Sequence, residues 1–209
     1  MDWPHVRGRW GPRDAHGHLG LLILEGLLLR EVRLLGTASA EVLGAGDLLR
    51  PWDTDGEHGL PTPVEVHWTT LAPCRVAILD PRFLVRAARW PDVLARLTGR
   101  SVARAKALAL HDAITNLKHV ETRVLVQFWH LAERWGRVSI GGISVPVPLT
   151  HEMLAKLVGA TRPSVSTALS QLAARGLLVR ENREVWRLCP DSREALAPLP
   201  VQPDTRLPV

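Results

Sequence analysis

The chain has 209 residues, 46% hydrophobic and 22% charged, a composition that supports one or two globular domains with substantial cores. The net charge of +5 points to a polyanionic partner, and two cysteines exclude a disulfide scaffold or a multi-cysteine metal cluster. The longest apolar run, Leu19–Leu29, is interrupted by Glu25 and is too short to cross a bilayer. Because the N-terminus also lacks a signal-peptide layout, we expect a cytoplasmic protein without a membrane partner.

Charge is divided along the chain. Residues 19–80 contain four arginines against nine acidic residues, a net of −5. Residues 82–137 contain eleven basic and four acidic residues, a net of +7, and residues 147–190 add a net of +3. An acidic front and a basic back half predict two domains with different partners.

The front half predicts β-structure. Turn signals separate five short strand-like runs: Leu19–Leu24, Leu27–Leu34, Glu41–Leu43, Val64–Trp68 and Arg75–Leu79. Strands at this spacing predict a sandwich or barrel. Only eighteen residues precede the first run, so the domain either lacks its opening strands or uses Trp3 and Trp10 differently. Trp52 and Trp68 are candidates for lining a ligand pocket, although as core or surface aromatics they need no ligand.

A long helix is predicted from Asp92 onward. Five apolar residues recur at spacings of 4, 3, 4 and 3, which places them on one stripe: Ala103, Ala107, Leu110, Ile114 and Leu117. A second apolar set on the same helix faces the β-structure in this interpretation: Leu94, Leu97 and Leu108. Two apolar faces need two surfaces, so we expect the stripe to be a dimer interface, with packing inside one domain as the alternative. His119–Trp135 predicts another amphipathic helix.

From Thr150 onward the sequence predicts two short helices joined by a tight turn. Thr150 is a good N-cap for the first helix, and Gly159-Ala160 supplies a turn at which two helices cross closely. Thr161 is the next N-cap, and Pro163 is tolerated in the first turn of a helix. These signals predict a helix-turn-helix.

The outward face of the second helix is rich in short hydrogen-bonding side chains, which suits a helix lying in a DNA major groove. A hairpin from Leu177 to Leu188 follows and would form a wing. A helix-turn-helix used only for protein contacts is the alternative. The candidate DNA-binding residues are Thr150, His151, Thr161, Arg162, Pro163, Ser164, Ser166, Thr167, Ser170 and Arg183.

With these marks, the chain from about Leu19 to Leu188 resembles the CRP/FNR family of bacterial transcription regulators. The Gly-x-Gly-Asp turn at Gly44–Asp47, the long helix and the terminal helix-turn-helix carry the resemblance. It implies an α+β fold with a jelly-roll-like, cyclic-nucleotide-binding-like β-roll at 1–90, a dimerisation helix at 91–118, a winged helix-turn-helix at 119–190 and a flexible tail at 191–209.

The resemblance implies a homodimer that binds an approximately palindromic double-stranded DNA site and works with RNA polymerase. In the family, the arginine matching Arg162 commonly reads a guanine. Pro163 stands where a glutamate is often found, and Thr167 stands where a second arginine is found. The target sequence is therefore expected to differ from that of the best-known members.

The ligand site departs from the family pattern. Family members that bind cAMP hold its phosphate with a Gly-Glu pair followed by an arginine. This chain has Gly56-Glu57 but no lysine or arginine between Arg50 and Arg75. Since an uncompensated buried phosphate is costly, we expect no cAMP and no resident cofactor, and the effector stays unassigned.

Metal-based sensing is only weakly indicated. Two cysteines are too few for an iron–sulfur cluster. Haem ligation by a histidine stays open, and His16-Gly17-His18 is the place to look for a metal, although a polar entry segment is the simpler interpretation. We expect no metal site.

Two other function classes are compatible with parts of the sequence. One is a small-molecule-sensing β-roll whose helix-turn-helix serves assembly. The other is a cupin-like enzyme, which needs clustered histidines or carboxylates on facing strands, whereas only His67 lies in a predicted strand. No nucleophile–base constellation stands out, so we expect no enzyme.

Overall fold

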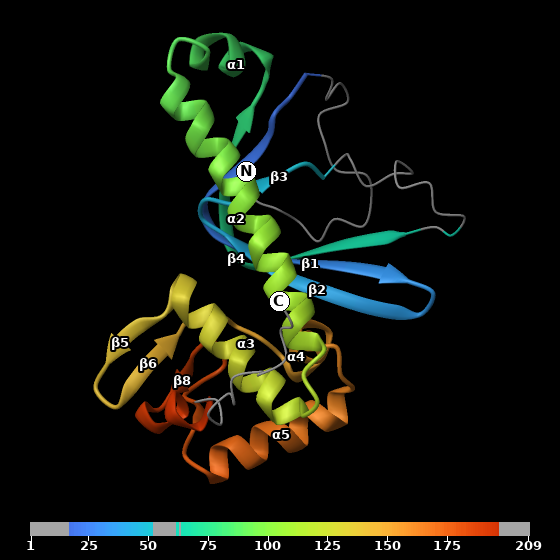
Figure 1. The fold of residues 1–209 in the computed structure, drawn as a ribbon, viewed down its shortest axis with the longest axis vertical. Coiled ribbons are helices and arrows are strands. Elements are labelled where there is room, and N and C mark those ends of the chain that lie inside the picture. The colour runs from blue at the N-terminus through green and yellow to red at the C-terminus, as the bar shows by residue number, and fades with distance from the viewer. Residues whose placement is uncertain (1–16, 52–61, 63, 197–209) are drawn as a thin grey trace, which may run out of the picture.

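The computed structural model describes residues 17–51, 62 and 64–196. Trp3, Trp10, His16, Trp52, Gly56-Glu57 and the tail from residue 197 lie outside the described residues. The described chain runs from an N-terminal sheet through a long helix into a compact helical and β unit at the other end of the molecule (Figure 1).

The N-terminal sheet is organised around one long strand. β1 (Gly20–Leu34) pairs antiparallel with β2 (Thr37–Gly44), β3 (Leu48–Leu49) and β4 (Glu65–Leu79). The expected break at Glu25-Gly26 is a shift of register inside β1 rather than a turn between two strands. Gly26 has φ +93°, and a Cβ there would lie 2.2 Å from the carbonyl oxygen of Pro73. The prediction of five short strands is therefore wrong, because a bulge bends each long strand without ending it.

Two helices connect the sheet to the C-terminal unit. After α1 (Pro81–Ala87), α2 (Pro91–Thr115) runs alongside the sheet and α3 (Val120–Trp135) opens the second unit (Figure 1). That unit continues with β5 (Arg137–Ser139), β6 (Gly142–Val145), α4 (His151–Leu157), α5 (Arg162–Ala174), β7 (Leu178–Arg180) and β8 (Trp186–Leu188). None of the described helices combines the length and hydropathy of a membrane-spanning segment.

The start of the predicted flexible tail is folded. Two short 3₁₀ helices span Pro190–Ser192 and Glu194–Leu196. Ser192 is fully buried and its hydroxyl donates to the carbonyl of Cys189. The expectation of a flexible segment is thus wrong for residues 191–196.

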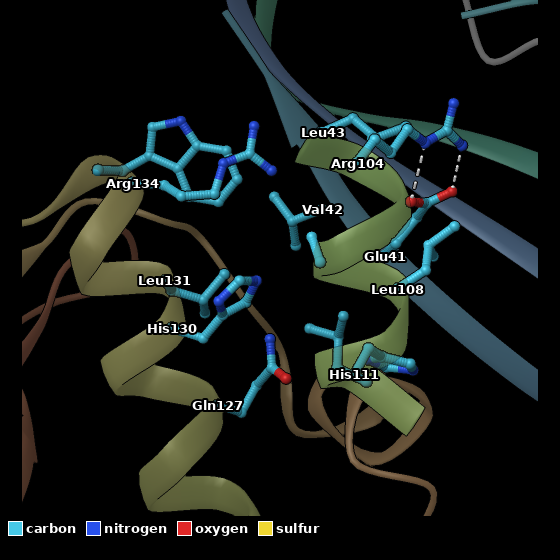
Figure 2. Close-up of a pocket in the computed structure, with 13 residues that line it drawn as sticks. Glu41, Val42, Leu43, Arg104, Leu108, His111, Gln127, His130, Leu131 and Arg134 are labelled. Atoms are coloured by element: carbon cyan, nitrogen blue, oxygen red, sulfur yellow. Dashed lines mark hydrogen bonds and ion pairs between the residues drawn. The ribbon is translucent and has the colours of Figure 1, made fainter. Parts of the chain in front are cut away.

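The larger hydrophobic core joins the sheet to the C-terminal unit. Leu29 and Val42 from β1 and β2 pack in the same buried cluster as Phe128, Leu154 and Leu172 from α3, α4 and α5. A separate, smaller cluster lies within the sheet around Leu28. A small cavity remains between β2, α2 and α3 (Figure 2). The two units are therefore held together by apolar packing as well as by chain connectivity.

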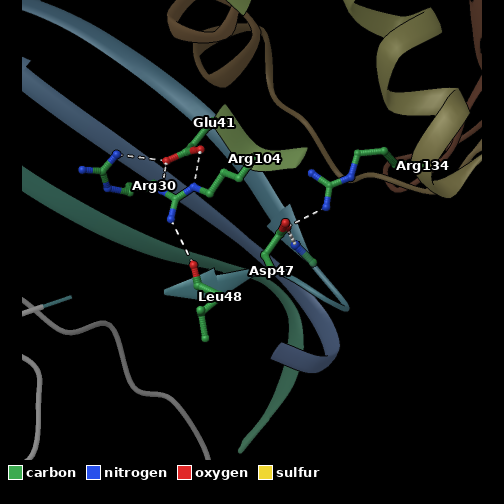
Figure 3. A network of polar contacts seen from close by, with 7 residues as sticks. Arg30, Glu41, Asp47, Leu48, Arg104 and Arg134 are labelled. Carbon is green, nitrogen blue, oxygen red and sulfur yellow. Dashed lines mark hydrogen bonds and ion pairs between the residues drawn. The ribbon is translucent and has the colours of Figure 1, made fainter. Parts of the chain in front are cut away.

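Ion pairs fasten the two helices to the sheet (Figure 3). The Glu41 carboxylate of β2 accepts from Arg104 of α2 at 2.6 Å and from Arg30 of β1 at 2.9 Å. In the turn after β2, Asp47 accepts from Arg134 of α3 at 2.6 Å and from the backbone N–H of Gly44 at 2.8 Å. The position of α2 and α3 on the sheet is thus fixed by half-buried charge pairs.

The apolar stripe predicted on α2 is divided by the fold. Ala103 and Leu110 are exposed, whereas Ala107 and Leu117 are half-buried. Ile114 is only 1% exposed, because its side chain packs inside its own protomer. Ile114 is therefore not available to a second copy, and its assignment to a dimer interface is corrected.

Candidate nucleic-acid interface

The first helix of the motif is capped as the sequence predicts. The Thr150 hydroxyl accepts from the backbone N–H of Met153 at 3.2 Å, and α4 buries Leu154 and Leu157. The turn that follows contains Gly159 with φ +59°, a conformation that favours glycine. These features confirm the helix start and the tight turn.

An arginine that the sequence analysis missed holds the turn in place. The guanidinium of Arg123 on α3 donates to the carbonyls of Leu117 at 2.6 Å and of Gly159 at 3.0 Å. It thereby ties the end of α4 to the connection between α2 and α3. No local pattern marks this role, because the carbonyl of Gly159 lies 36 residues further along the chain than Arg123.

The second helix, α5, begins as predicted. Thr161 is its N-cap, accepting from the N–H of Ser164 at 3.3 Å, and Pro163 lies in the first turn. The predicted inward face is confirmed by the buried residues Val165, Ala168, Leu169 and Leu172. The opposite face, including Arg162, Ser164, Thr167 and Ser170, is exposed, while Ser166 is half-buried. α5 therefore presents the predicted polar face to the outside.

Hydroxyl groups on that face are already used as donors. Ser166, Thr167 and Ser170 each donate to a carbonyl four residues earlier in the helix, at 3.0 to 3.2 Å. Their oxygens keep lone pairs that can accept hydrogen bonds. Ser166 also lies 2.9 Å from Nδ1 of His151, which connects the starts of α4 and α5. In this state the three hydroxyls are acceptors toward a ligand.

Arg162 supplies the positive charge at the start of α5. It is exposed, and no carboxylate of the described residues pairs with its guanidinium. Burial lowers the pKa of His151 below its ordinary value, and the positive charges of Arg180 and Arg162 lower it further. At neutral pH His151 is therefore an uncharged hydrogen-bonding group between two cations.

The hairpin after α5 forms the predicted wing. β7 and β8 pair antiparallel, and the Asn182 side chain accepts from the N–H groups of Glu184 and Val185 at 2.8 and 2.9 Å. The guanidinium of Arg180 lies over the Trp186 ring at 5.1 Å and donates to the carbonyl of Arg183. Arg180 thus stiffens the wing, while the Arg183 side chain is exposed at its tip.

Most of the basic residues of segment 82–137 are not at this interface. α1 and the first half of α2 carry several of its arginines, and they lie at the end of the molecule opposite α5 (Figure 1). Arg104 and Arg134 form ion pairs with Glu41 and Asp47. The net charge of +7 in segment 82–137 is therefore only partly available at this interface.

The candidate tryptophan pocket is not assembled in the described residues. Trp52 lies outside them. Trp68 is half-buried and packs on the small core of the sheet, with the Arg30 guanidinium 5.9 Å from its ring centre. Trp68 thus lies at the edge of the small core, and the pocket with Trp52 stays a prediction.

Comparison with known proteins identifies the C-terminal module. Residues 122–197 match the model of the Crp-like helix-turn-helix domain. A CRP-like cAMP-activated global transcriptional regulator of Mycobacterium tuberculosis is 31% identical over 142 residues, which cover 66% of this chain and 63% of that protein. The match thus spans less than two thirds of the relative's length.

Solved structures share the fold of most of the chain. A CRP-family transcriptional regulator from Thermus thermophilus superposes with a TM-score of 0.60 at 23% identity, covering 80% of this chain and 82% of its own. A cyclic nucleotide-binding domain containing protein from Listeria monocytogenes gives 0.63 at 19% identity, covering 80% and 78%. At these identities the likeness establishes the fold.

Fold and site together define a winged helix-turn-helix protein of α+β class with an N-terminal β-roll. Residues 122–197 match a helix-turn-helix domain of the kind that binds DNA. Residues 122–197 therefore form a Crp-like helix-turn-helix domain, and the chain as a whole is similar in fold to CRP/FNR transcription regulators.

Proposed function

We propose that the chain is a homodimeric transcription regulator that binds an approximately palindromic DNA site through α5. The observation that carries the proposal is the outer face of α5. There Arg162 is exposed and unpaired among the described residues, beside hydroxyl groups whose oxygens face outward. A bidentate arginine–guanine contact is the commonest specific contact in the major groove.

The roles of the other candidate residues follow from their positions. Thr150, Thr161 and Ser164 lie at the starts of α4 and α5, where backbone N–H groups and short hydroxyls are suited to phosphate oxygens. Arg183 at the wing tip is suited to a phosphate beside the groove. We assign positioning to these groups and sequence discrimination to Arg162.

The proposed dimer surface is an apolar stripe on α2 that leaves out the buried Ile114. At about 100° per residue, one face of the helix collects exposed apolar residues: Val102, Ala103, Ala109, Leu110 and Ala113. We call this set the outer stripe. Val102 is 50% exposed and Leu110 42%, whereas the opposite face meets the sheet through Leu97 and Arg104. Lys106 lies among the stripe residues, and its long stem can pack while the ammonium reaches the edge.

Two copies joined along the outer stripe would present two copies of α5 to DNA. Helix-turn-helix dimers place their recognition helices about 34 Å apart, one turn of duplex, and so bind half-sites of two-fold symmetry. We propose the division of labour that the sequence indicates: a sensor-like roll at 1–90, a dimerisation helix at 91–118 and a DNA-binding domain at 119–190. RNA polymerase is the proposed further partner, and the cytoplasm is the proposed location.

We propose further that cAMP is not the effector. The Mycobacterium tuberculosis relative is named as cAMP-activated, but this chain has no lysine or arginine between Arg50 and Arg75. In the described sheet, Arg30 and Arg75 pair with carboxylates, which leaves neither free for a phosphate. Isothermal titration of the purified protein with cAMP is expected to show no binding, and binding at physiological concentration would reject this part of the proposal.

Selection of bound duplexes from a random DNA pool, with no added ligand, tests the main proposal. The expected result is a palindromic motif recovered by the wild-type protein and weakened in Arg162→Ala. Folded protein that enriches no motif would reject effector-free, sequence-specific binding. If the same protein self-associates through its helix-turn-helix, the assembly alternative would replace the proposal.

A further inference from the structure

The cavity between the sheet and the two connecting helices contains unsatisfied polar groups. β2, α2 and α3 enclose a space of about 30 Å³ into which Gln127 and His130 point from α3 (Figure 2). Oε1 of Gln127 and Nδ1 of His130 are buried and have no hydrogen-bond partner among the described residues. Gln127 is only 3% exposed. Because buried polar atoms are normally paired, this junction is an exception that needs an explanation.

The size and chemistry of the cavity limit what it can hold. About 10–15 Å³ of such volume accommodates one water-sized group, so 30 Å³ is too small for an organic effector. The described residues contain no group of three or more histidine, cysteine, aspartate or glutamate side chains able to hold a metal ion. One or two water molecules fit this space, and apart from water the lining groups can take a proton.

Two histidines from different helices line this cavity. His111 of α2 lies 3.2 Å through Nε2 from the hydroxyl of Ser39 on β2, and His130 comes from α3. Both are half-buried at the contact between α2, which carries the outer stripe, and α3, the first helix of the DNA-binding domain. A charge placed on either ring would therefore fall between the two helices.

Three of the elements packed around His111 and His130 contribute charged side chains. β2 contributes Glu41, α2 contributes Arg104 and Asp112, and α3 contributes Glu133 and Arg134, while α4 contributes only the apolar Leu157. Arg104 and Arg134 are held by the carboxylates of Glu41 and Asp47. Glu41 is thus occupied by arginines, and the exposed carboxylates of Asp112 and Glu133 favour an imidazolium only in part.

Burial is the main influence on both rings. Burial lowers the pKa of His111, and Glu41 and Asp112 oppose the shift only in part. Burial likewise lowers the pKa of His130, and the positive charges of Arg134 and of a protonated His111 lower it further against Glu133. Both imidazoles are neutral at pH 7, and a proton on one disfavours a proton on the other.

We propose that His111 and His130 make the junction of α2 and α3 a proton-operated joint, in which protonation loosens α3 from α2 and the sheet. The effect on DNA binding rests on the proposed function, because α2 would fix the spacing of the two recognition helices. When the joint is loosened, the two recognition helices no longer hold a fixed spacing. DNA binding must then order them, and the free energy that this costs lowers the affinity.

The direction of the effect follows from linkage. The two folded-state pKa values lie below the ordinary value of 6.5, so the packed joint has its full stability above pH 6.5. As the pH falls below 6.5, the open form binds more protons than the packed form, so the packed form becomes less stable relative to the open form. The loss continues until the pH reaches the folded-state values.

Amide hydrogen exchange without DNA tests the joint directly. After correction for the intrinsic exchange rate, peptides of α3 in the wild type are expected to open about tenfold more at pH 5.5 than at pH 7.5. The double variant His111→Gln/His130→Gln should lose this change, and His67→Gln, altered at a half-buried histidine of β4 that does not line the cavity, should retain it. Equal pH responses in wild type and double variant would overturn the proposal.

A measurement on the unaltered protein guards against misfolding of the double variant. Histidine ring signals followed by NMR during a pH titration are expected to show His111 and His130, together with His151, titrating below the ordinary range. Titration of both His111 and His130 at or above 6.5 would overturn the proposal, whatever the variants do.

DNA affinity across the same pH range then links the joint to function. Relative to the double variant, the wild type is expected to lose about three- to tenfold more affinity between pH 7.5 and 5.5, with His151 unchanged in both proteins. Equal losses in the two proteins would overturn the link to DNA binding. Because the exchange experiment needs no DNA, failure of the proposed function and failure of the joint give different results.

Discussion

The sheet and the winged helix-turn-helix differ in their arginines, because only the latter also exposes arginines at its recognition helix and wing tip without a carboxylate partner among the described residues, beside the paired Arg175 and Arg187. On the sheet, the arginines of the strands are paired with carboxylates: Arg30 with Glu41, Arg33 with Glu31, and Arg75 with Glu25. At the helix-turn-helix, Arg162 and Arg183 have no carboxylate partner among the described residues. A count of basic residues along the sequence therefore overstates the charge available to a ligand, because internal pairing must be subtracted first.

The arginines of the two units also differ in whether they are available to an anion. A strand arginine that is committed to a carboxylate cannot receive a phosphate without breaking that pair. The exposed arginines at α5 and at the wing need only release their counterions. This difference supports the proposal that DNA is bound at α5 and the wing.

The largest expected effect comes from the outer stripe. Leu110→Arg places a charge in the proposed dimer surface, so the protein should sediment as a monomer. Its affinity for a two-half-site duplex should fall by about 100-fold or more, because the second recognition helix is no longer linked to the first. Analytical ultracentrifugation and DNA titration measure the two effects.

Val93→Arg is the matched control. Val93 is also exposed on α2, at 38%, but lies on the side of the helix away from the outer stripe. It should leave both the sedimentation and the DNA affinity unchanged. A dimeric Leu110→Arg protein would reject this surface as the interface.

Arg162→Ala is expected to have the next largest effect. It should weaken binding to the preferred site by about 1–3 kcal/mol and change binding to random duplex much less. Arg162→Lys keeps the charge but loses the two-pronged geometry, so it should recover non-specific affinity without recovering discrimination. Equal losses on preferred and random duplexes would assign Arg162 to phosphate contact instead.

The helix-turn-helix could be predicted because its signals are local. Thr150, Thr161, Pro163 and Gly159 act on their own turns, and each is where the sequence analysis places it. Capping and turn preferences depend on neighbours a few residues away, which the sequence displays directly.

The α2 assignment failed in part because burial depends on distant elements. Spacing alone showed that Ile114 and Leu110 share a broad apolar face, but not that the fold buries Ile114 and leaves Leu110 exposed. The pairings Arg104–Glu41 and Arg134–Asp47 join residues 63 and 87 positions apart, which no spacing rule reveals.

Lys156→Met tests the charge contact between the units. The Lys156 ammonium lies 2.8 Å from the Glu31 carboxylate, and Glu31 is only 7% exposed. Its loss should lower the free energy of unfolding at pH 7 by about 1–3 kcal/mol, because a buried acceptor loses a charged donor while Arg33 remains. Urea unfolding measures the difference, and Lys118→Met, at an exposed lysine in the α2–α3 connection, is the control.

The same pair predicts a dependence on pH. Burial of Glu31 opposes its ionisation, but donation from Lys156 and Arg33 outweighs this and holds its pKa below the ordinary value. A lowered carboxyl pKa contributes stability that is complete above 4.5 and is lost as the pH falls through the folded-state value. The advantage of the wild type over Lys156→Met should therefore shrink between pH 5 and pH 3. A constant difference would mean that packing of the lysine stem, and not its charge, supplies the stability.

The smallest expected effect belongs to the wing tip. Arg183→Ala removes one exposed cation while Arg180 and Asn182 keep the hairpin folded. Affinity should fall a fewfold and equally for preferred and random duplexes. The slope of log affinity against log salt should fall by about 1 for each lost phosphate contact. Arg193→Ala, at an exposed arginine outside the recognition helix and wing, should leave the slope unchanged. A change in sequence preference in Arg183→Ala would instead show that the wing reads bases, so that discrimination would no longer rest on α5 alone.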